Sequence, residues 1–178
     1  MTSKALLRLR ALQLLTTLDA KRREEAALAA FLFLSSHLKN TPQNVLSFAS
    51  NPLEINLWPS NQWLLKNHKL FLPKIEDTSL VPYEVLSFEQ LVSCKHSIKE
   101  PDPKVCRKIS LEEIDLVLVP GLYFDPHFHR IGYGKGYFDR FLSTLPNALK
   151  WGIGFTEQKM PKLPQEAHDI ALDKVFLF

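Results

Sequence analysis

The sequence is poor in glycine and cysteine, and it contains no long apolar run. Two cysteines, Cys94 and Cys106, are too few for a disulfide framework in 178 residues, and they lack the spacing of metal ligands. No apolar stretch approaches the roughly 20 residues that span a bilayer. The N-terminus does not have the pattern of a signal peptide, because Arg8 and Arg10 interrupt its apolar stretch and no small-residue cleavage site follows. We therefore expect a cytoplasmic protein with two free thiols and no membrane association.

The chain also lacks the concentrated basic stripe that is typical of nucleic-acid-binding proteins. Its formal net charge is +3, and of its two tight basic clusters, residues 4–10 and 21–25, the second contains two glutamates. There is no internal repeat and no low-complexity tract. This charge balance suits a small anionic ligand, and we expect a monomer that does not bind nucleic acid.

Hydrophobic residues at helical spacing predict helices over residues 3–18, from Asp19 or Ala20 to Leu38, and over residues 137–145. Ser3 is the expected cap of the first helix. A loop and a short helix are expected over residues 54–67. Strands are predicted by apolar segments at residues 44–50, 68–75, 80–88, 114–121, 149–155 and 173–178. Residues 93–110 contain two prolines and are predicted as an irregular connection.

The unbroken apolar run at residues 116–119 indicates a strand buried on both faces, as in a parallel sheet covered by helices. The alternation of helices and strands predicts a single α/β domain over residues 1–178, with a largely parallel sheet between helices. Ligands of such sheets bind beyond the carboxyl ends of the strands. Residues 120–136 follow the clearest strand directly, so we expect a ligand there.

Three of the six glycines, Gly132, Gly134 and Gly136, lie within five residues, with Lys135 between the last two. Their spacing fits neither the Walker pattern nor the dinucleotide-binding pattern. Glycines permit positive φ and a close approach of backbone to ligand, and consecutive amides in such a turn form an anion-binding nest. With Lys135, Arg130 and the N-terminus of the following helix, the segment is typical of a phosphate site. A tight surface turn that needs glycine for its geometry is the alternative.

Four charged residues are further candidates for such a site. Lys4 and Arg8 are four residues apart and project from one helix face, and spacing alone favours two solvated cations. Asp139 lies in the first turn of its helix, where it can complement the helix dipole or bind magnesium beside phosphates. Asp169 is a possible second carboxylate for the same ion.

A different cluster, His127 and His129 alternating with Asp125, has some likeness to a metal site. No third ligand follows at a helpful spacing. We therefore interpret this segment as an exposed loop.

Several segments, taken in order, resemble the 5-formyltetrahydrofolate cyclo-ligase family, also called methenyltetrahydrofolate synthetases. The segments that carry the resemblance are DLVLVPGLYFD, RIGYGKGYFDRFL, EAHD and LDKV, with weaker support from KALLR, SFASNPLEIN and SIKEP. The resemblance implies a three-layer α/β/α sandwich with a largely parallel central sheet, Rossmann-like and related to sugar-phosphate isomerases and CoA transferases. It also implies an ATP- and magnesium-dependent conversion of 5-formyltetrahydrofolate to 5,10-methenyltetrahydrofolate, with release of ADP and phosphate.

The resemblance assigns roles residue by residue. It assigns ATP binding to Lys4, Ala5, Leu6, Leu7, Arg8, Arg130, Ile131, Gly132, Tyr133, Gly134, Lys135, Gly136, Tyr137 and Phe138. It assigns folate binding to Ala49, Glu54, Tyr133, Gly134, Lys135, Gly136 and Tyr137, and magnesium binding to Asp139 and Asp169. Within this set we expect Lys135, Arg130 and Tyr137 to act in the chemical step.

Three positions depart from the family's pattern. Phe128 stands where the family usually has glycine, which predicts a different path for the loop before Arg130. Phe138 replaces a common tyrosine, and Leu57 stands where a threonine often follows the pocket glutamate. A sugar-phosphate isomerase or phosphosugar-binding domain of related fold is the main alternative function, and such a site does not require Lys4 and Arg8 together with Glu54.

Overall fold

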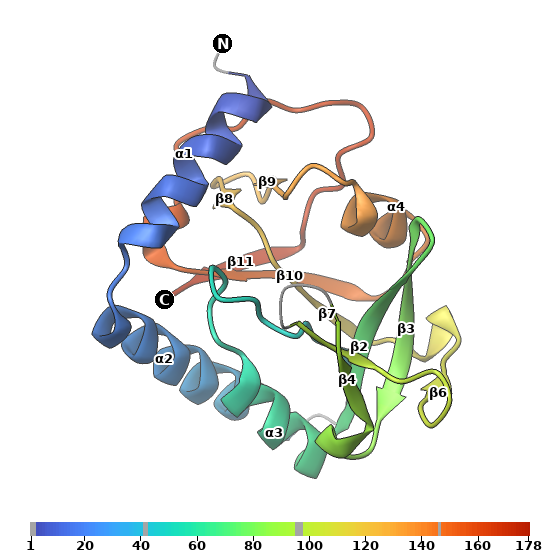
Figure 1. The fold of residues 1–178 in the computed structure, drawn as a ribbon. Helices are drawn as coiled ribbons and strands as arrows, with labels where there is room; N and C mark the ends of the chain where they lie inside the picture. The colour runs from blue at the N-terminus through green and yellow to red at the C-terminus, as the bar shows by residue number, and fades with distance from the viewer. Residues whose placement is uncertain (1–2, 41–42, 95–97, 146) are drawn as a thin grey trace.

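A seven-stranded sheet forms the centre of the computed structural model, which describes residues 3–40, 43–94, 98–145 and 147–178 (Figure 1). The strand order is β11-β10-β7-β1-β2-β3-β6. The neighbours from β11 to β2 pair in parallel: β11 (Lys174–Leu177), β10 (Leu149–Gly154), β7 (Leu116–Val119), β1 (Asn44–Leu46) and β2 (Lys69–Glu76). The predicted α/β class with a largely parallel sheet is confirmed.

The other edge of the sheet is antiparallel. Strand β3 (Ser79–Val85) pairs antiparallel with β2, and β6 (Arg107–Lys108) pairs antiparallel with β3. Only Asp77 and Thr78 separate β2 from β3, and so short a connection can join antiparallel strands but not parallel ones.

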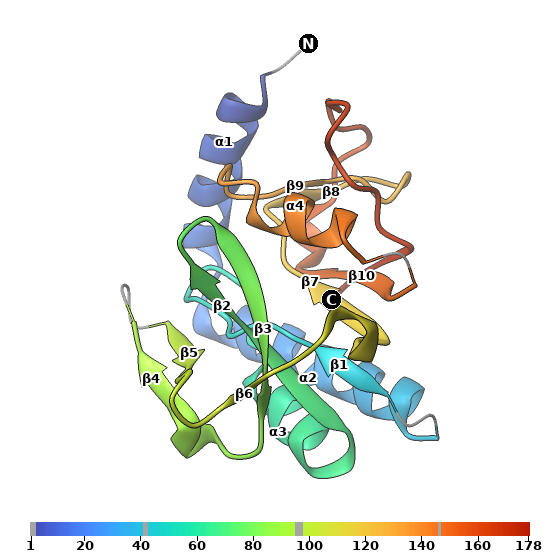
Figure 2. The same cartoon turned by 90° about the vertical axis from the view of Figure 1, so that its right-hand side faces the viewer.

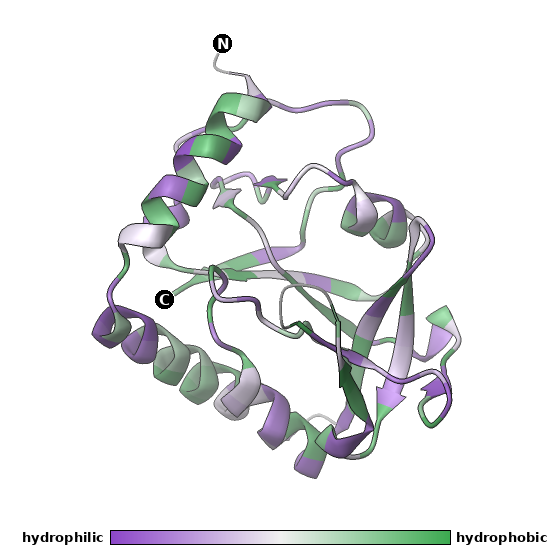
Figure 3. Ribbon diagram, in the orientation of Figure 1, coloured by the Kyte–Doolittle hydropathy of each residue, from purple (hydrophilic) through white to green (hydrophobic). Residues whose placement is uncertain are grey.

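Helices cover both faces of the sheet (Figure 2). Helices α1 (Lys4–Thr17), α2 (Ala20–Leu38) and α3 (Trp58–Asn67) pack on one face. Ser3 and Asp19 cap α1 and α2, each accepting a hydrogen bond from a backbone amide of the first turn, as their residue types favour. Figure 3 shows that α2 begins with hydrophilic residues and continues with mostly hydrophobic ones. The other face carries α4 (Tyr137–Ser143), which has only seven residues, so loops complete that layer.

The side chains of β7 explain its unbroken apolar run. Leu116 and Leu118 belong to the core under α1–α3, whereas Val117 and Val119 belong to the core on the face of α4. All four are fully buried, as expected for a central parallel strand with both faces covered. None of the helices in the described ranges is both long and apolar enough to cross a membrane.

Short elements are where the sequence-based expectations fail. The strand predicted over residues 44–50 ends at Leu46, because the chain then leaves the sheet toward the cavity described below. The connection predicted as irregular contains β5 (Lys99–Pro101) and β6, and β5 pairs with β4 (Leu91–Ser93). A second small hairpin joins β8 (Tyr123–Phe124) to β9 (Arg130–Ile131), and 3₁₀ turns occupy Phe88–Gln90, Leu111–Glu113 and Thr156–Gln158.

Candidate functional site

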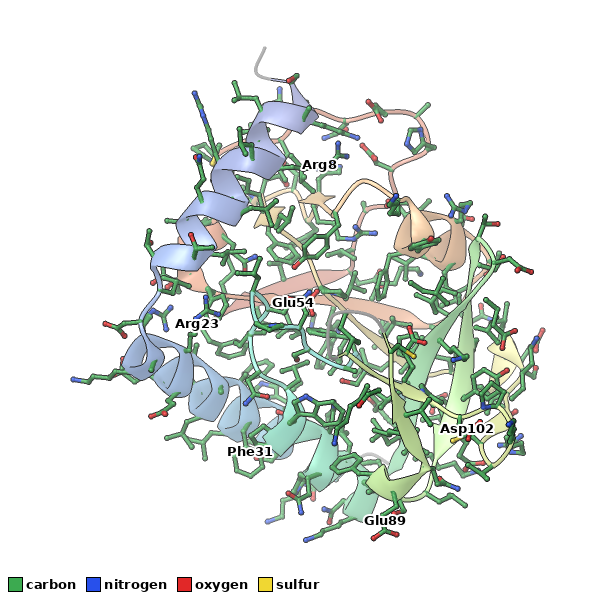
Figure 4. The ribbon with its side chains drawn as sticks, viewed as in Figure 1. Arg8, Arg23, Phe31, Glu54, Glu89 and Asp102 are labelled. Carbon is green, nitrogen blue, oxygen red and sulfur yellow. The ribbon has the colours of Figure 1, made fainter. Side chains whose placement is uncertain are left out.

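A cavity of about 490 Å³ lies beyond the carboxyl ends of β1 and β7. It is bordered by the N-terminal turns of α1, the loop after β1, the β2–β3 hairpin, residues 130–139 and residues 166–169. Its volume falls in the usual range for small-molecule sites, about 300–1,000 Å³. The expectation that the ligand site follows the parallel strands is in agreement with this position. Figure 4 shows Arg8 on α1 and Glu54 in the loop that follows β1.

Most residues that the sequence assigned to the site line this one cavity. They come from four separate segments and are Lys4, Arg8, Ala49, Glu54, Asp169 and every residue from Arg130 to Asp139. Three assigned residues do not line it. Ala5 and Leu6 are exposed on the outer face of α1, and Leu7 is buried in the core beneath it. Lys4 and Arg8, four residues apart, share the helix face toward the cavity, whereas Leu7 lies on the face that packs on the core.

The segment of residues 132–136, here called the glycine loop, has a backbone that requires glycine at two positions. Gly134 has φ +97° and Gly136 has φ +66°, both in the left-handed region. A Cβ atom at Gly134 would also lie 3.2 Å from the Arg8 guanidinium. The chain therefore uses two of its few glycines to form this turn.

Two arginines hold the carbonyl groups of the glycine loop. Arg8 Nε donates to the Gly132 carbonyl at 3.0 Å, and an Arg140 guanidinium nitrogen donates to the Lys135 carbonyl at 3.1 Å. Within the described part of the chain, no acceptor takes a hydrogen bond from the backbone amides of residues 132–136. A run of amides without partners, beside Lys135, is the arrangement that binds anionic oxygens.

Arg130 is the buried cation of the site. Its side chain is only 3% exposed, and it donates to Asp139 Oδ1 at 2.9 Å. Its guanidinium lies 5.8 Å from the centre of the Phe138 ring. Burial lowers the pKa of Arg130, while the charges of Asp139 and Asp169 act in the opposite direction. The two predicted metal ligands therefore both lie close enough to influence one guanidinium.

Asp169 is paired with Lys4. The Lys4 ammonium lies 2.8 Å and 2.5 Å from the two carboxylate oxygens of Asp169, and 3.0 Å from Glu166 Oε2. Burial acts to raise the pKa of Asp169, but Lys4 and the Glu166 amide outweigh it and the pKa lies below its ordinary value. Glu166, His168 and Asp169 each offer a ligand atom, and these atoms lie within 4.8 Å of one another. Asp139 is not part of that group in the described residues.

Glu54 is a half-buried carboxyl that lines the cavity from the loop after β1. Its carboxylate accepts the Asn51 backbone amide at 2.9 Å, and the Tyr133 hydroxyl lies beside it. The Asn51 side chain also donates to the Tyr133 hydroxyl at 3.2 Å. Burial raises the pKa of Glu54 to about 7 despite the hydrogen bond from the Asn51 amide. Tyr133 belongs to the glycine loop, so one side chain connects the loop to the carboxyl of Glu54.

The three residues that depart from the family's pattern have different consequences in the structure. Phe128 has φ +65°, so it adopts the left-handed conformation that suits glycine. Phenylalanine at this position therefore does not need the different path that the sequence predicted for the loop before Arg130. Phe138 packs against the Arg130 guanidinium through its ring, so the missing hydroxyl leaves that contact in place. Leu57 is fully buried in the core and does not line the cavity.

Asp125 has a structural role in the loop between β8 and β9. Its buried carboxylate accepts the backbone amides of His127, His129 and Leu163 at 2.9–3.0 Å. Burial acts to raise the pKa of Asp125, but these three donors outweigh it and lower the pKa. Among the described residues, no group with metal-ligand geometry includes this cluster, and the exposed His127 fits the interpretation as a loop.

Several residues of the cavity were not predicted from the sequence. Asn51 adjoins the Glu54 segment, and Glu166 and His168 belong to the EAHD segment from which only Asp169 was taken. Proximity to these motifs could have identified all three. Pro73, Ile75 and Leu80 of the β2–β3 hairpin also line the cavity, and no local pattern indicated them. Ile98, Lys99 and Glu100 line it as well, and they belong to the SIKEP segment, to which no site role was assigned.

Known proteins resemble this chain in sequence and in fold. A protein from Caenorhabditis elegans, described as a probable 5-formyltetrahydrofolate cyclo-ligase, is 37% identical over 97 residues, which are 50% of this chain and 47% of that protein. The chain spans about half the length of the first curated relatives that it matches.

Two solved structures extend the likeness to nearly the whole chain. The 5,10-methenyltetrahydrofolate synthetase of Aquifex aeolicus has a TM-score of 0.82 and 30% identity, covering 97% of this chain and 88% of that one. The synthetase of Mycoplasma pneumoniae has a TM-score of 0.79 at 22% identity, covers 98% of both chains, and supports the fold alone. The model of the 5-formyltetrahydrofolate cyclo-ligase family matches residues 1–177. The chain therefore belongs to the 5-formyltetrahydrofolate cyclo-ligase family.

Proposed function

We propose that this protein, as one catalytic domain over residues 1–178, converts 5-formyltetrahydrofolate to 5,10-methenyltetrahydrofolate at the expense of ATP. The family to which the chain belongs supports this proposal. The observation that carries it is the composition of the cavity. A phosphate-type loop and an enclosed carboxyl, Glu54, line the same space, and Tyr133 contacts Glu54 from within that loop.

The glycine loop would bind the phosphates of ATP. Its unpaired amides supply directed donors, and Lys135, Lys4 and Arg8 supply positive charge around the same cavity. Arg130 is held in place by Asp139 and would present its remaining N–H groups to the transferring phosphoryl group. Tyr137, the next residue after the loop, lines the cavity and would border both substrates.

Glu54 would bind the pterin ring of the folate. An ionised carboxylate accepts hydrogen bonds, and the aminopyrimidine part of a pterin offers N–H donors in a suitable geometry. Ala49 has a small side chain at the same edge and leaves space for the ring. Asn51 and Tyr133 hold the Glu54 carboxyl in position before the ring arrives.

The reaction then has two steps. The formyl oxygen attacks the γ-phosphorus of ATP, the bond to the β,γ-bridging oxygen breaks, and ADP leaves, which gives an iminium phosphate at N5. N10 next attacks the formyl carbon, the carbon–oxygen bond breaks, phosphate leaves with the former formyl oxygen, and the N10 proton is lost. Residues that hold both substrates in register and stabilise charge supply most of the catalysis.

The residues present also fit a magnesium ion. Asp139 and Asp169 are carboxylates at the phosphate side of the cavity, and Glu166 adds another oxygen donor beside Asp169. When bound, magnesium would neutralise phosphate charge. Lys4 would have to leave Asp169 for that carboxylate to act as a ligand, and its ammonium would then be free to approach the nucleotide.

The sugar-phosphate alternative is not favoured. The cavity contains Lys4 and Arg8 together with Glu54, a combination that a sugar-phosphate site does not require. A monomeric state and the absence of a nucleic-acid partner stay predictions.

The proposal is tested by mixing the purified protein with 5-formyltetrahydrofolate, magnesium and ATP, and following the absorbance of methenyltetrahydrofolate together with ADP. We expect both products in equal amounts, and neither when ATP is omitted. ATP hydrolysis without methenyltetrahydrofolate, or no turnover with either substrate, would contradict the proposed activity.

A further inference from the structure

Arg140 bridges two walls of the cavity without lining its main space. One guanidinium nitrogen donates to the carbonyl of Lys135 at 3.1 Å, and another donates to the carbonyl of Thr78 at 2.8 Å. Lys135 belongs to the glycine loop, and Thr78 lies in the turn between β2 and β3. Figure 1 and Figure 2 both show this hairpin turn beside α4, in agreement with the packing of α4 on β3.

The surroundings of Arg140 fix its guanidinium. The group lies 5.4 Å from the centre of the Tyr137 ring, a distance typical of a cation–π contact. A Cβ atom at Gly136 would lie 2.9 Å from the same guanidinium nitrogen that contacts Lys135. Glycine at position 136 is therefore needed for its positive φ, and any other residue would also displace the guanidinium from this place.

The direction of the Lys135 carbonyl determines the direction of the next amide. In a planar trans peptide the C=O and the following N–H point to opposite sides. Since Arg140 holds the Lys135 carbonyl on its own side, the Gly136 amide points away from Arg140. Arg8 fixes the Gly132 carbonyl at the other end of the loop in the same way, and thereby the direction of the Tyr133 amide.

We propose that Arg140 is a positioning residue that holds the glycine loop in its anion-binding shape and does not contact the nucleotide itself. The proposal rests on the proposed function in one respect, namely that the ligand of this loop is the phosphate chain of ATP. Arg140 also fastens the loop to the β2–β3 hairpin, whose residues Ile75 and Leu80 line the same cavity. Arg140 thus links the loop to the hairpin wall.

The test uses Arg140→Ala and Arg140→Lys, with Arg107→Ala as the matched control. Arg107 is an exposed arginine with two acidic partners, Glu84 and Glu113, and none of the three lines the cavity. Calorimetric titrations with ATP, with inorganic tripolyphosphate and with 5-formyltetrahydrofolate are made on each folded variant. Limited digestion with trypsin, which cleaves after Lys135, reports the order of the ligand-free loop through the rate of that one cleavage.

We expect Arg140→Ala to weaken the binding of ATP and of tripolyphosphate by about tenfold to a hundredfold, since hydrogen bonds from a charged donor are lost. Affinity for the folate should stay unchanged, and cleavage after Lys135 should accelerate in the ligand-free protein. Arg140→Lys, which keeps the charge and can reach one carbonyl, should be intermediate. Added methylguanidinium should partly restore ATP affinity to Arg140→Ala, and Arg107→Ala should resemble the wild type throughout.

Three results would overturn the proposal. An unchanged rate of cleavage after Lys135, together with weakened binding of ATP, would mean that Arg140 contacts the nucleotide directly. Equal weakening of folate binding and ATP binding would mean that Arg140 has a general structural role. Unchanged affinity for ATP would mean that Arg140 has no role in shaping the loop. Tripolyphosphate binding that depends on Arg140 in a protein without cyclo-ligase turnover would refute the proposed activity while leaving the role of Arg140 intact.

Discussion

Replacing Glu54 by glutamine should change how the stability of the protein depends on pH. The carboxyl is enclosed beside the cavity, and burial raises its pKa to about 7 from an ordinary value of 4.5. Glutamine has nearly the same shape and keeps an oxygen that can accept the Asn51 amide. The substitution therefore removes the titration of Glu54 while largely preserving the packing around it.

The sign and size follow from the two pKa values. Between pH 4.5 and pH 7 the folded protein binds a proton at Glu54 that the unfolded chain has released. The protonated carboxyl therefore makes its full contribution to the free energy of unfolding below pH 4.5. This contribution is lost as the pH rises through the folded pKa. At about 1.4 kcal/mol per pKa unit, the loss across the whole window is about 3 kcal/mol.

The assay is urea unfolding of the wild type and Glu54→Gln at pH values from 5 to 8. We expect the free energy of unfolding of the variant, relative to wild type, to increase with pH by about 2–3 kcal/mol. Glu113→Gln is the control, because the pKa of Glu113 is lowered to about 2 and its charge does not change in this range. If the free energy of unfolding changed with pH in the same way for wild type and Glu54→Gln, Glu54 would titrate normally. The inference that its carboxyl is enclosed would then be wrong.

Three further predictions concern the loop and its neighbours. Lys135→Met should lower the rate of the chemical step by on the order of 10²–10³, measured in single-turnover experiments, and turnover near that of the wild type would exclude this role. Asp139→Asn and Asp169→Asn should each raise the magnesium concentration at half-maximal rate, with a non-additive double variant, and unchanged magnesium titrations of both would leave the metal assignment without support. Phe128→Gly should be more stable than Phe128→Ala by about 1 kcal/mol in thermal unfolding, because both lose the ring and only glycine relieves the left-handed backbone. Equal stability of the two variants would show that φ +65° carries no strain at this position.

Local patterns in the sequence predicted the elements that depend on local interactions. The cap Ser3, the periodicity of the first two helices and the doubly buried strand 116–119 are all confirmed. The pairing of β2 with β3 was not predicted, because an apolar strand does not reveal its partner. Only the two-residue turn at 77–78 contained that information, and it carries no glycine to indicate it.

The candidate site was predicted where a motif is continuous and missed where it is assembled by the fold. Residues 130–139 line the cavity as one stretch, and Glu54 and Asp169 reach it from distant segments as the family resemblance implied. Ala5, Leu6 and Leu7 were included as part of a range, although helical spacing places only Lys4 and Arg8 on the cavity face. The hairpin residues came from long-range packing, for which the sequence offered no local signal.

In the proposed reaction, one cavity brings the formyl oxygen of the folate to the γ-phosphate of ATP. The most direct measurement is the fate of a heavy oxygen isotope placed in the formyl group of 5-formyltetrahydrofolate, followed by mass spectrometry of the released phosphate. We expect each phosphate formed with methenyltetrahydrofolate to carry one labelled oxygen. Unlabelled phosphate, with the label recovered in water, would contradict the proposed reaction, because the formyl oxygen would then have left without being phosphorylated.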